Sequence, residues 1–116
     1  MSRRRVPTAV LIGAPTDVGA SERGASMGPE ALRVAGLARR LEEYGLKVVD
    51  RGNLAGPGNP NCAAADGYRH LGEVASWSRL VHDAVLDELR AQRLPVLLGG
   101  DHSLAVGSIS AVARDC

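Results

Sequence analysis

The feature that most constrains the fold is a pattern that repeats along the chain: a short apolar segment, then a loop or turn, then a stretch with helical periodicity. The apolar segments are residues 6–13, 46–50 and 94–98. The connections between them are too long for hairpins, so the segments are expected to be parallel strands covered by helices. The sequence therefore predicts an α/β fold, a parallel sheet with helices on both faces, built from about three strand–helix units.

The third apolar segment, LPVLL at residues 94–98, shows no alternation of apolar and polar residues. A continuous apolar strand is typical of a parallel sheet whose two faces are both covered. We therefore expect residues 94–98 to be buried on both faces. If this strand is left at an edge of the sheet, it carries no charge that would discourage pairing with another chain.

Two longer stretches predict amphipathic helices. The first begins with Pro29 as a first helical position, and apolar residues then recur at helical spacing until Gly45. The second has an apolar face that includes Trp77 and Val81, and Pro95 marks its end. A third helix is expected from Ser103 onwards.

The composition indicates one globular domain over residues 1–116. Hydrophobic residues make up 45% of the chain and charged residues 23%, which is ordinary for a folded domain. A formal net charge of +1, with two tyrosines, one tryptophan and no phenylalanine, argues against nucleic-acid binding and against binding to an anionic membrane. The apolar run that follows the three arginines near the start is too short to span a bilayer.

Cys62 and Cys116 are the two cysteines, and they are far apart in the sequence. They form neither a CxxC pair nor a disulfide framework, and zinc sites use short paired spacings. We expect two unrelated thiols in a reducing, cytoplasmic setting.

Polar residues with metal-binding chemistry follow the third apolar segment, in LLGGDHSLAVGS at residues 97–108. Ligands of open parallel sheets bind beyond the carboxyl ends of the strands, and Gly99 and Gly100 allow a sharp turn there. His102 could ligate a metal, with Asp101 as a further ligand or as acceptor of the second ring proton. Alternatively, Asp101 caps the following helix and His102 is an ordinary turn residue. One His–Asp pair does not make a site, since a divalent metal normally needs at least three protein ligands.

The loop after the first strand, residues 15–28, is expected to line the same crevice through Asp17 and Ser21, although a plain surface connection is the alternative. It lacks the lysine of a phosphate-binding loop. Ser103 and Ser108 lack the strained-turn pattern of a serine nucleophile. His70 and His82 are expected on a solvated helix face, outside the site.

Two segments resemble one known family. GGDHSLAVGSISAVAR resembles the first metal-binding segment of arginases, and RGASMGPEALRVAGL is similar to the glycine-rich loop and helix start that precede it in those enzymes. The resemblance covers the chain from Val10 onwards. The Ser-Leu-Ala-x-Gly-Ser run after His102 is the arginase form rather than the agmatinase form.

This resemblance implies an arginase-like three-layer fold and manganese-dependent hydrolysis of L-arginine to L-ornithine and urea. His102 would be a ligand of one of two manganese ions, which share a bridging hydroxide that attacks the guanidinium carbon. A guanidinium is a poor electrophile because its charge is delocalised, so metal activation of water suits the reaction. Several aspartates are needed to neutralise two cations beside a cationic substrate.

The family's Asp-Ala-His-x-Asp segment, its later Asp-x-Asp segment, its proton-shuttle histidine and its substrate-orienting glutamate have no match in these residues. The sequence thus resembles the amino-terminal third of a single ureohydrolase domain, and we expect the isolated chain to be inactive. A non-catalytic truncated homologue and another ureohydrolase, such as an agmatinase, stay open as alternatives. For a longer parent, the resemblance implies a homo-trimer or homo-hexamer.

Overall fold

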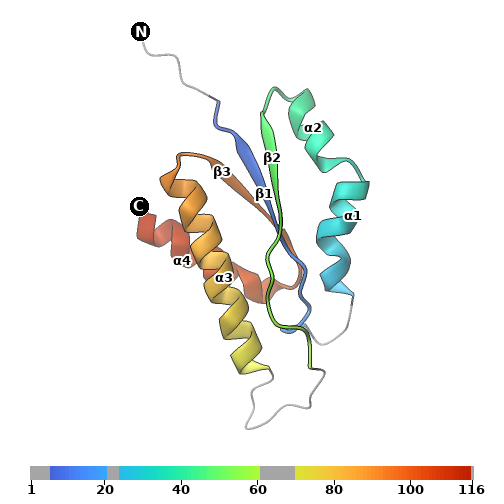
Figure 1. The fold of residues 1–116 in the computed structure, drawn as a ribbon, viewed down its shortest axis with the longest axis vertical. Helices are drawn as coiled ribbons and strands as arrows, with labels where there is room; N and C mark the ends of the chain where they lie inside the picture. Colours follow the sequence, from blue (N-terminus) through green and yellow to red (C-terminus); the bar gives the residue numbers. More distant parts are fainter. Residues whose placement is uncertain (1–5, 21–23, 61–69, 116) are drawn as a thin grey trace.

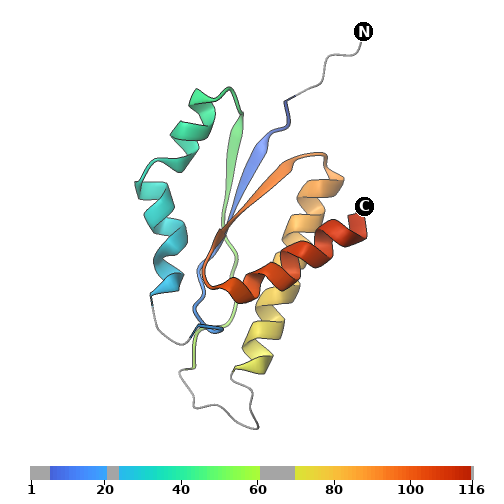
Figure 2. The ribbon, with the colours of Figure 1, turned by 180° about the vertical axis from the view of Figure 1, so that it is seen from behind.

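The computed structural model describes residues 6–20, 24–60 and 70–115. Strands β1 (Ala9–Ala14), β2 (Val48–Asn53) and β3 (Leu94–Gly99) form a parallel sheet with the order β2-β1-β3. Figures 1 and 2 show helices α1 (Gly28–Val34) and α2 (Leu37–Glu43) on one face. Helices α3 (Leu71–Arg90) and α4 (Ala105–Asp115) cover the other. The predicted parallel sheet with helices on both faces is confirmed.

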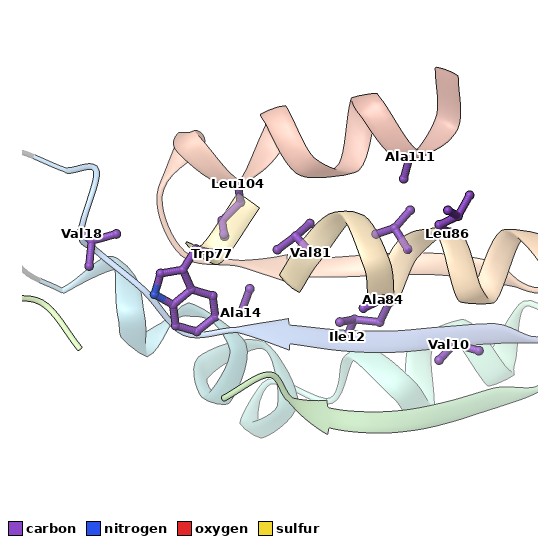
Figure 3. Close-up of a cluster of buried hydrophobic side chains, with 11 residues drawn as sticks. Val10, Ile12, Ala14, Val18, Trp77, Val81, Ala84, Leu86, Leu104 and Ala111 are labelled. Carbon is purple, nitrogen blue, oxygen red and sulfur yellow. The ribbon is translucent and has the colours of Figure 1, made fainter. Parts of the chain in front are cut away.

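The central strand organises the core. Every residue of β1 is buried, because the strand has a neighbour on each side and helices above and below. Val10, Ile12 and Ala14 join a cluster with Trp77 and Val81 of α3, which Figure 3 draws between β1 and the two covering helices. Burial of such side chains stabilises the fold by about 1.5–3 kcal/mol each.

The expectation that residues 94–98 are buried on both faces is wrong for the described chain. Strand β3 lies at one edge of the sheet, Leu94 is 44% exposed and only Leu98 of this strand is buried. Pairing with β1 covers one side of the strand, and the described residues put no strand on its other side. An apolar sequence therefore lies at an open edge.

The predicted helix over residues 29–44 is interrupted. Helix α1 ends at Val34 and α2 begins at Leu37, because Gly36 between them has a φ of +87°. Glycine adopts this left-handed conformation readily, and it breaks the helical backbone. The apolar periodicity continues across Gly36, so the sequence pattern does not show where the helix breaks.

The first two strands also start later than their apolar segments. Strand β1 begins at Ala9, and β2 runs over Val48–Asn53 instead of residues 46–50. Strand β2 is an edge strand, and most of it is exposed. Polar residues therefore continue it without a burial cost, so hydropathy does not mark its end.

Arg33 of α1 joins this polar strand to the helix layer. Its Nε and Nη2 atoms donate hydrogen bonds to the two carboxylate oxygens of Asp50, at 2.8 and 3.0 Å, and Nη1 donates to Glu30 and Asn53 at 2.8 and 2.6 Å. The two-point hydrogen bond from Arg33 lowers the pKa of Asp50, and the same contact raises the pKa of Arg33.

Helices α3 and α4 cross closely at Gly107, where an added Cβ atom would overlap the Ser78 carbonyl. His82 is half-buried at this crossing, and its Nδ1 atom lies 2.8 Å from Ser110 Oγ. The expectation of a solvated helix face is therefore met only in part by His82. In the described part of the chain, no helix is both long and apolar enough to cross a membrane.

Candidate functional site

The loops that follow β1 and β3 start side by side. Ala14 and Gly99 are register partners at the carboxyl ends of these strands, which is the edge where ligands of parallel sheets bind. The short 3-10 helices η1 (Ala25–Met27) and η2 (His102–Leu104) follow in the two loops. The topology thus brings residues 15–20 and 24–28 next to the turn that carries His102.

Glycines let the two loops meet backbone to backbone. Gly100 has a φ of +76°, and a Cβ atom there would lie 2.5 Å from the Ala14 carbonyl oxygen. A Cβ atom at Gly28 would overlap the Gly99 carbonyl group. The Gly100 N–H donates to the Ala25 carbonyl at 3.2 Å. Gly99 and Gly100 therefore form the sharp turn that the sequence predicts.

Asp101 caps η2 and connects the loop after β3 to the loop after β1. Its Oδ1 atom accepts hydrogen bonds from the Ser103 N–H at 2.9 Å and from the Ser103 hydroxyl. Its Oδ2 atom accepts from the Gly19 N–H at 2.8 Å, and its own N–H donates to the Thr16 carbonyl at 3.1 Å. The capping alternative for Asp101 is thus confirmed, while a contact with the His102 ring stays a prediction.

His102 is the first residue of η2, and it is exposed. Leu104, two residues later, is buried and anchors the far side of the turn. Within the described ranges, no three His, Cys, Asp or Glu side chains are grouped so that they could hold a metal ion. The described residues alone therefore do not fit a two-manganese centre, and the role of His102 as a ligand is not tested by them.

Asp17 is buried in the loop after β1. Its Oδ1 atom accepts a hydrogen bond from Asn59 Nδ2 at 2.8 Å, and its Oδ2 atom accepts from the Gly24 N–H at 3.3 Å. Asn59 lies in the loop after β2, so Asp17 joins two loops at the same edge of the sheet. Ser21, Cys62 and Cys116 lie outside the described residues.

An open cavity of about 560 Å³ lies between these two loops. Asp17 and Asn59 line it, together with residues that include Thr16, Ser26 and Met27. His102 is not among the lining residues. The loop after β1 therefore lies beside the His102 turn, but a crevice shared by Asp17 and His102 stays a prediction.

His70 corrects another expectation. It is 8% exposed, has a φ of +54° just before α3, and places Nδ1 2.8 Å from the Val18 carbonyl oxygen. His70 therefore supports the loop after β1 and does not lie on a solvated face. Ser103 and Ser108 use their hydroxyls locally, on Asp101 and on the Ala105 carbonyl.

Sequence reasoning missed the contacts that hold the loops together. Thr16 and Gly19 contact Asp101, and Trp77 donates a hydrogen bond from Nε1 to the Pro57 carbonyl at 2.8 Å. The glycines of the first loop were the available signal, because closely packed backbones require residues without Cβ atoms. Their partners are far away in sequence and leave no local pattern.

Comparison with known proteins places this geometry in a family. The sequence profile of the arginase family matches residues 7–116. The chain belongs to the arginase family. It is 38% identical over 104 residues to an arginase from Brevibacillus brevis, covering 90% of this chain and 35% of that protein. It is also 38% identical over 108 residues to an arginase from Agrobacterium fabrum, covering 92% of this chain and 33% of that protein.

The arginase family also accounts for the fold. The structure of an arginase from Bacillus caldovelox superposes with a TM-score of 0.85 at 33% identity, over 94% of this chain and 37% of that chain. This member of the arginase family thus spans about a third of the length of the relatives that it matches. The three-stranded sheet with its helices therefore matches part of the arginase fold.

Proposed function

We propose that this chain supplies the first metal-ligating turn of an arginase-type ureohydrolase, with His102 as a ligand to one of two manganese ions. The reaction of the complete enzyme would be hydrolysis of L-arginine to L-ornithine and urea. The observation that carries the proposal is the placement of His102. It follows the carboxyl end of β3, on a turn held by the loop after β1, in a chain whose relatives are arginases.

In this proposal, the bound metals would make a nucleophile from water. The residues of this chain would orient the first ligand: Gly99 and Gly100 turn the backbone, and Asp101 fixes the turn. The carboxylates that the described residues lack would come from further polypeptide. Assembly of a complete enzyme as a homo-trimer or homo-hexamer and a cytoplasmic location belong to the same proposal.

A hybrid enzyme tests the proposal. Residues 7–116 would replace the matching third of the arginase from Bacillus caldovelox, and urea release from L-arginine would be measured with manganese present. We expect activity, and we expect His102→Ala to lower kcat/KM by at least about 100-fold, since loss of a metal ligand is severe. His82→Ala is the matched control because His82 lies at the α3–α4 crossing, and it should keep most of the activity.

A non-catalytic homologue is the second candidate, and the position of His102 outside the lining of the cavity that holds Asp17 favours it. It predicts a hybrid that folds and assembles but releases no urea. An arginase-type protein predicts a hybrid that is active and depends on His102. A folded hybrid whose activity is the same with His102→Ala would reject the proposed role of His102.

A further inference from the structure

The carboxylate of Asp101 divides its two oxygens between two segments of the chain. Oδ1 accepts hydrogen bonds within its own turn, from Ser103. Oδ2 accepts from Gly19, which lies 82 residues earlier in the loop after β1. We propose that Asp101 is a positioning residue, whose carboxylate locks the turn that carries His102 to the loop after β1 and so fixes the direction of the His102 ring. The proposal rests on the proposed function only for the role of His102.

The hydrogen bonds of Asp101 matter because few other contacts among the described residues restrict the position of the His102 side chain. It is exposed and belongs to a helix of only three residues. Its order must therefore come from its neighbours in the chain, Asp101 before it and the buried Leu104 after it. Metal ligands work only when their geometry is held closely, within about 0.5 Å. A turn tied at one end only would let the ring move over a wider range.

A carboxylate is the side chain that this arrangement requires. The Gly19 and Ser103 N–H groups are both donors, and they approach different oxygens. Asparagine has one acceptor oxygen and one donor group, so it can serve only one of the two segments. Asparagine is as good a helix cap as aspartate. Asp101→Asn therefore keeps the cap and breaks the lock.

Gly19 offers a second way to open the same contact. An added Cβ atom there would lie 2.8 Å from Ser103 Cβ and 2.9 Å from Asp101 Oδ1. Gly19→Ala therefore pushes the loop away from the turn and leaves the carboxylate chemistry intact. Ser103→Ala is the matched control, because it removes only the hydroxyl contact and keeps both backbone N–H bonds to Asp101.

The experiment uses NMR on the isotope-labelled 116-residue chain without metal. It measures amide hydrogen exchange at Gly19 and Ser103, and the order parameter of the His102 ring Cε1–H bond. In Asp101→Asn we expect the Gly19 amide to exchange on the order of tenfold faster, because it loses a charged acceptor. The Ser103 amide should stay within about twofold, and the ring order parameter should fall. Gly19→Ala should lower the ring order similarly, and Ser103→Ala should not.

The proposal is overturned if Gly19 exchange does not change in Asp101→Asn, or if the Gly19 amide is freed while the His102 ring keeps its order. In the second case Asp101 supports only the fold. Exchange at the buried Leu11 amide reports whether each variant is folded. If Asp101→Asn unfolds, Gly19→Ala decides: reduced ring order supports the proposal, and unchanged ring order rejects it. No metal is needed, so these results are separate from the hybrid assay of the proposed function.

Discussion

The side-chain amide of Asn59 donates a hydrogen bond to the Asp17 carboxylate across 2.8 Å and thereby joins the loops that follow β2 and β1. The Gly19–Asp101 contact joins the first of these loops to the loop after β3. All three loops at the carboxyl edge of the sheet are therefore connected through residues 16–19. We therefore expect a change in one loop to alter the stability of the next.

Asn59→Asp should weaken this connection more than Asn59→Ala. The aspartate places a second carboxylate beside Asp17, while alanine only removes the hydrogen bond, so we expect about 1–3 kcal/mol of destabilisation for Asn59→Asp and less for alanine. Urea unfolding of both variants at neutral pH measures the difference. Acid should reduce it, because a shared proton removes the repulsion. Equal stabilities at neutral pH would mean that the two loops separate freely.

Gly28→Ala should destabilise the fold by about 1–3 kcal/mol, because its Cβ atom would overlap the Gly99 carbonyl group and overpacking costs that amount. Gly72→Ala is the matched control. Gly72 is also helical but has nothing within 4 Å of an added Cβ atom, so alanine there should be neutral or stabilising by up to about 1 kcal/mol. Thermal melts of both variants check this, and a neutral Gly28→Ala would show that the contact relaxes easily.

Stability should also depend on pH through the Arg33–Asp50 contact. The hydrogen bond from Arg33 holds the pKa of Asp50 in the folded state below its usual range. The stabilisation by this contact is therefore fully present above the pKa that Asp50 has in the unfolded chain. It is lost as the pH falls through the lower pKa that Asp50 has in the folded chain. Asp50 is 41% exposed on its side chain, so we expect only about 1 kcal/mol.

Urea unfolding of the parent chain and Asp50→Asn, from about pH 6 down to about pH 2.5, measures this contribution. The parent should be more stable at the upper end, and the difference should vanish at the lower end. A difference that stays constant across this range would assign the effect of Asp50→Asn to lost packing.

Particular residues show what the sequence could and could not predict. The strands at 6–13 and 94–98 and the helix around Trp77 were predicted because burial in a layered fold leaves a local apolar pattern. The break at Gly36 was missed because one left-handed residue interrupts a helix without changing its apolar period. His70 was misplaced because its partner, Val18, lies 52 residues away.

In the candidate site, too, the local pattern was predictable and the long-range contacts were not. The residue types of Gly99, Gly100 and His102 pointed to a turn at a strand end, which the structure confirms. Whether Asp101 capped the helix or faced a metal depended on Gly19 and Thr16, which approach it only in the folded chain. Sequence spacing therefore indicated where the chemistry lies but not how it is held.

The isolated chain, loaded with manganese, should release no detectable urea from L-arginine. A bridged metal pair needs several carboxylates, and the described residues hold no group of three ligand-type side chains. A sensitive urea assay at high protein concentration measures this against a metal-free sample. Urea release that His102→Ala abolishes would contradict the prediction and would direct attention to ligands shared between copies of the chain.

The last prediction concerns the open edge of the sheet. Among the residues that the structure describes, strand β3 has a paired neighbour on one side only, and Leu94 at its start is 44% exposed. An apolar edge strand without charge pairs readily with other chains, so the isolated chain should self-associate, and its melting temperature should rise with concentration. Leu94→Lys should reduce this association, because a charged edge discourages pairing.

Val49→Lys is the matched control for this edge. Val49 is 46% exposed on β2, the opposite edge strand, which already carries Asp50 and Arg51. Because charge already protects that edge, the lysine should leave self-association nearly unchanged. Sedimentation measurements over a range of concentrations would compare the two variants with the parent chain. A monomeric parent with a sharp, concentration-independent melt would show that the three-stranded sheet is self-sufficient and that half-burial of β3 is enough to protect its edge.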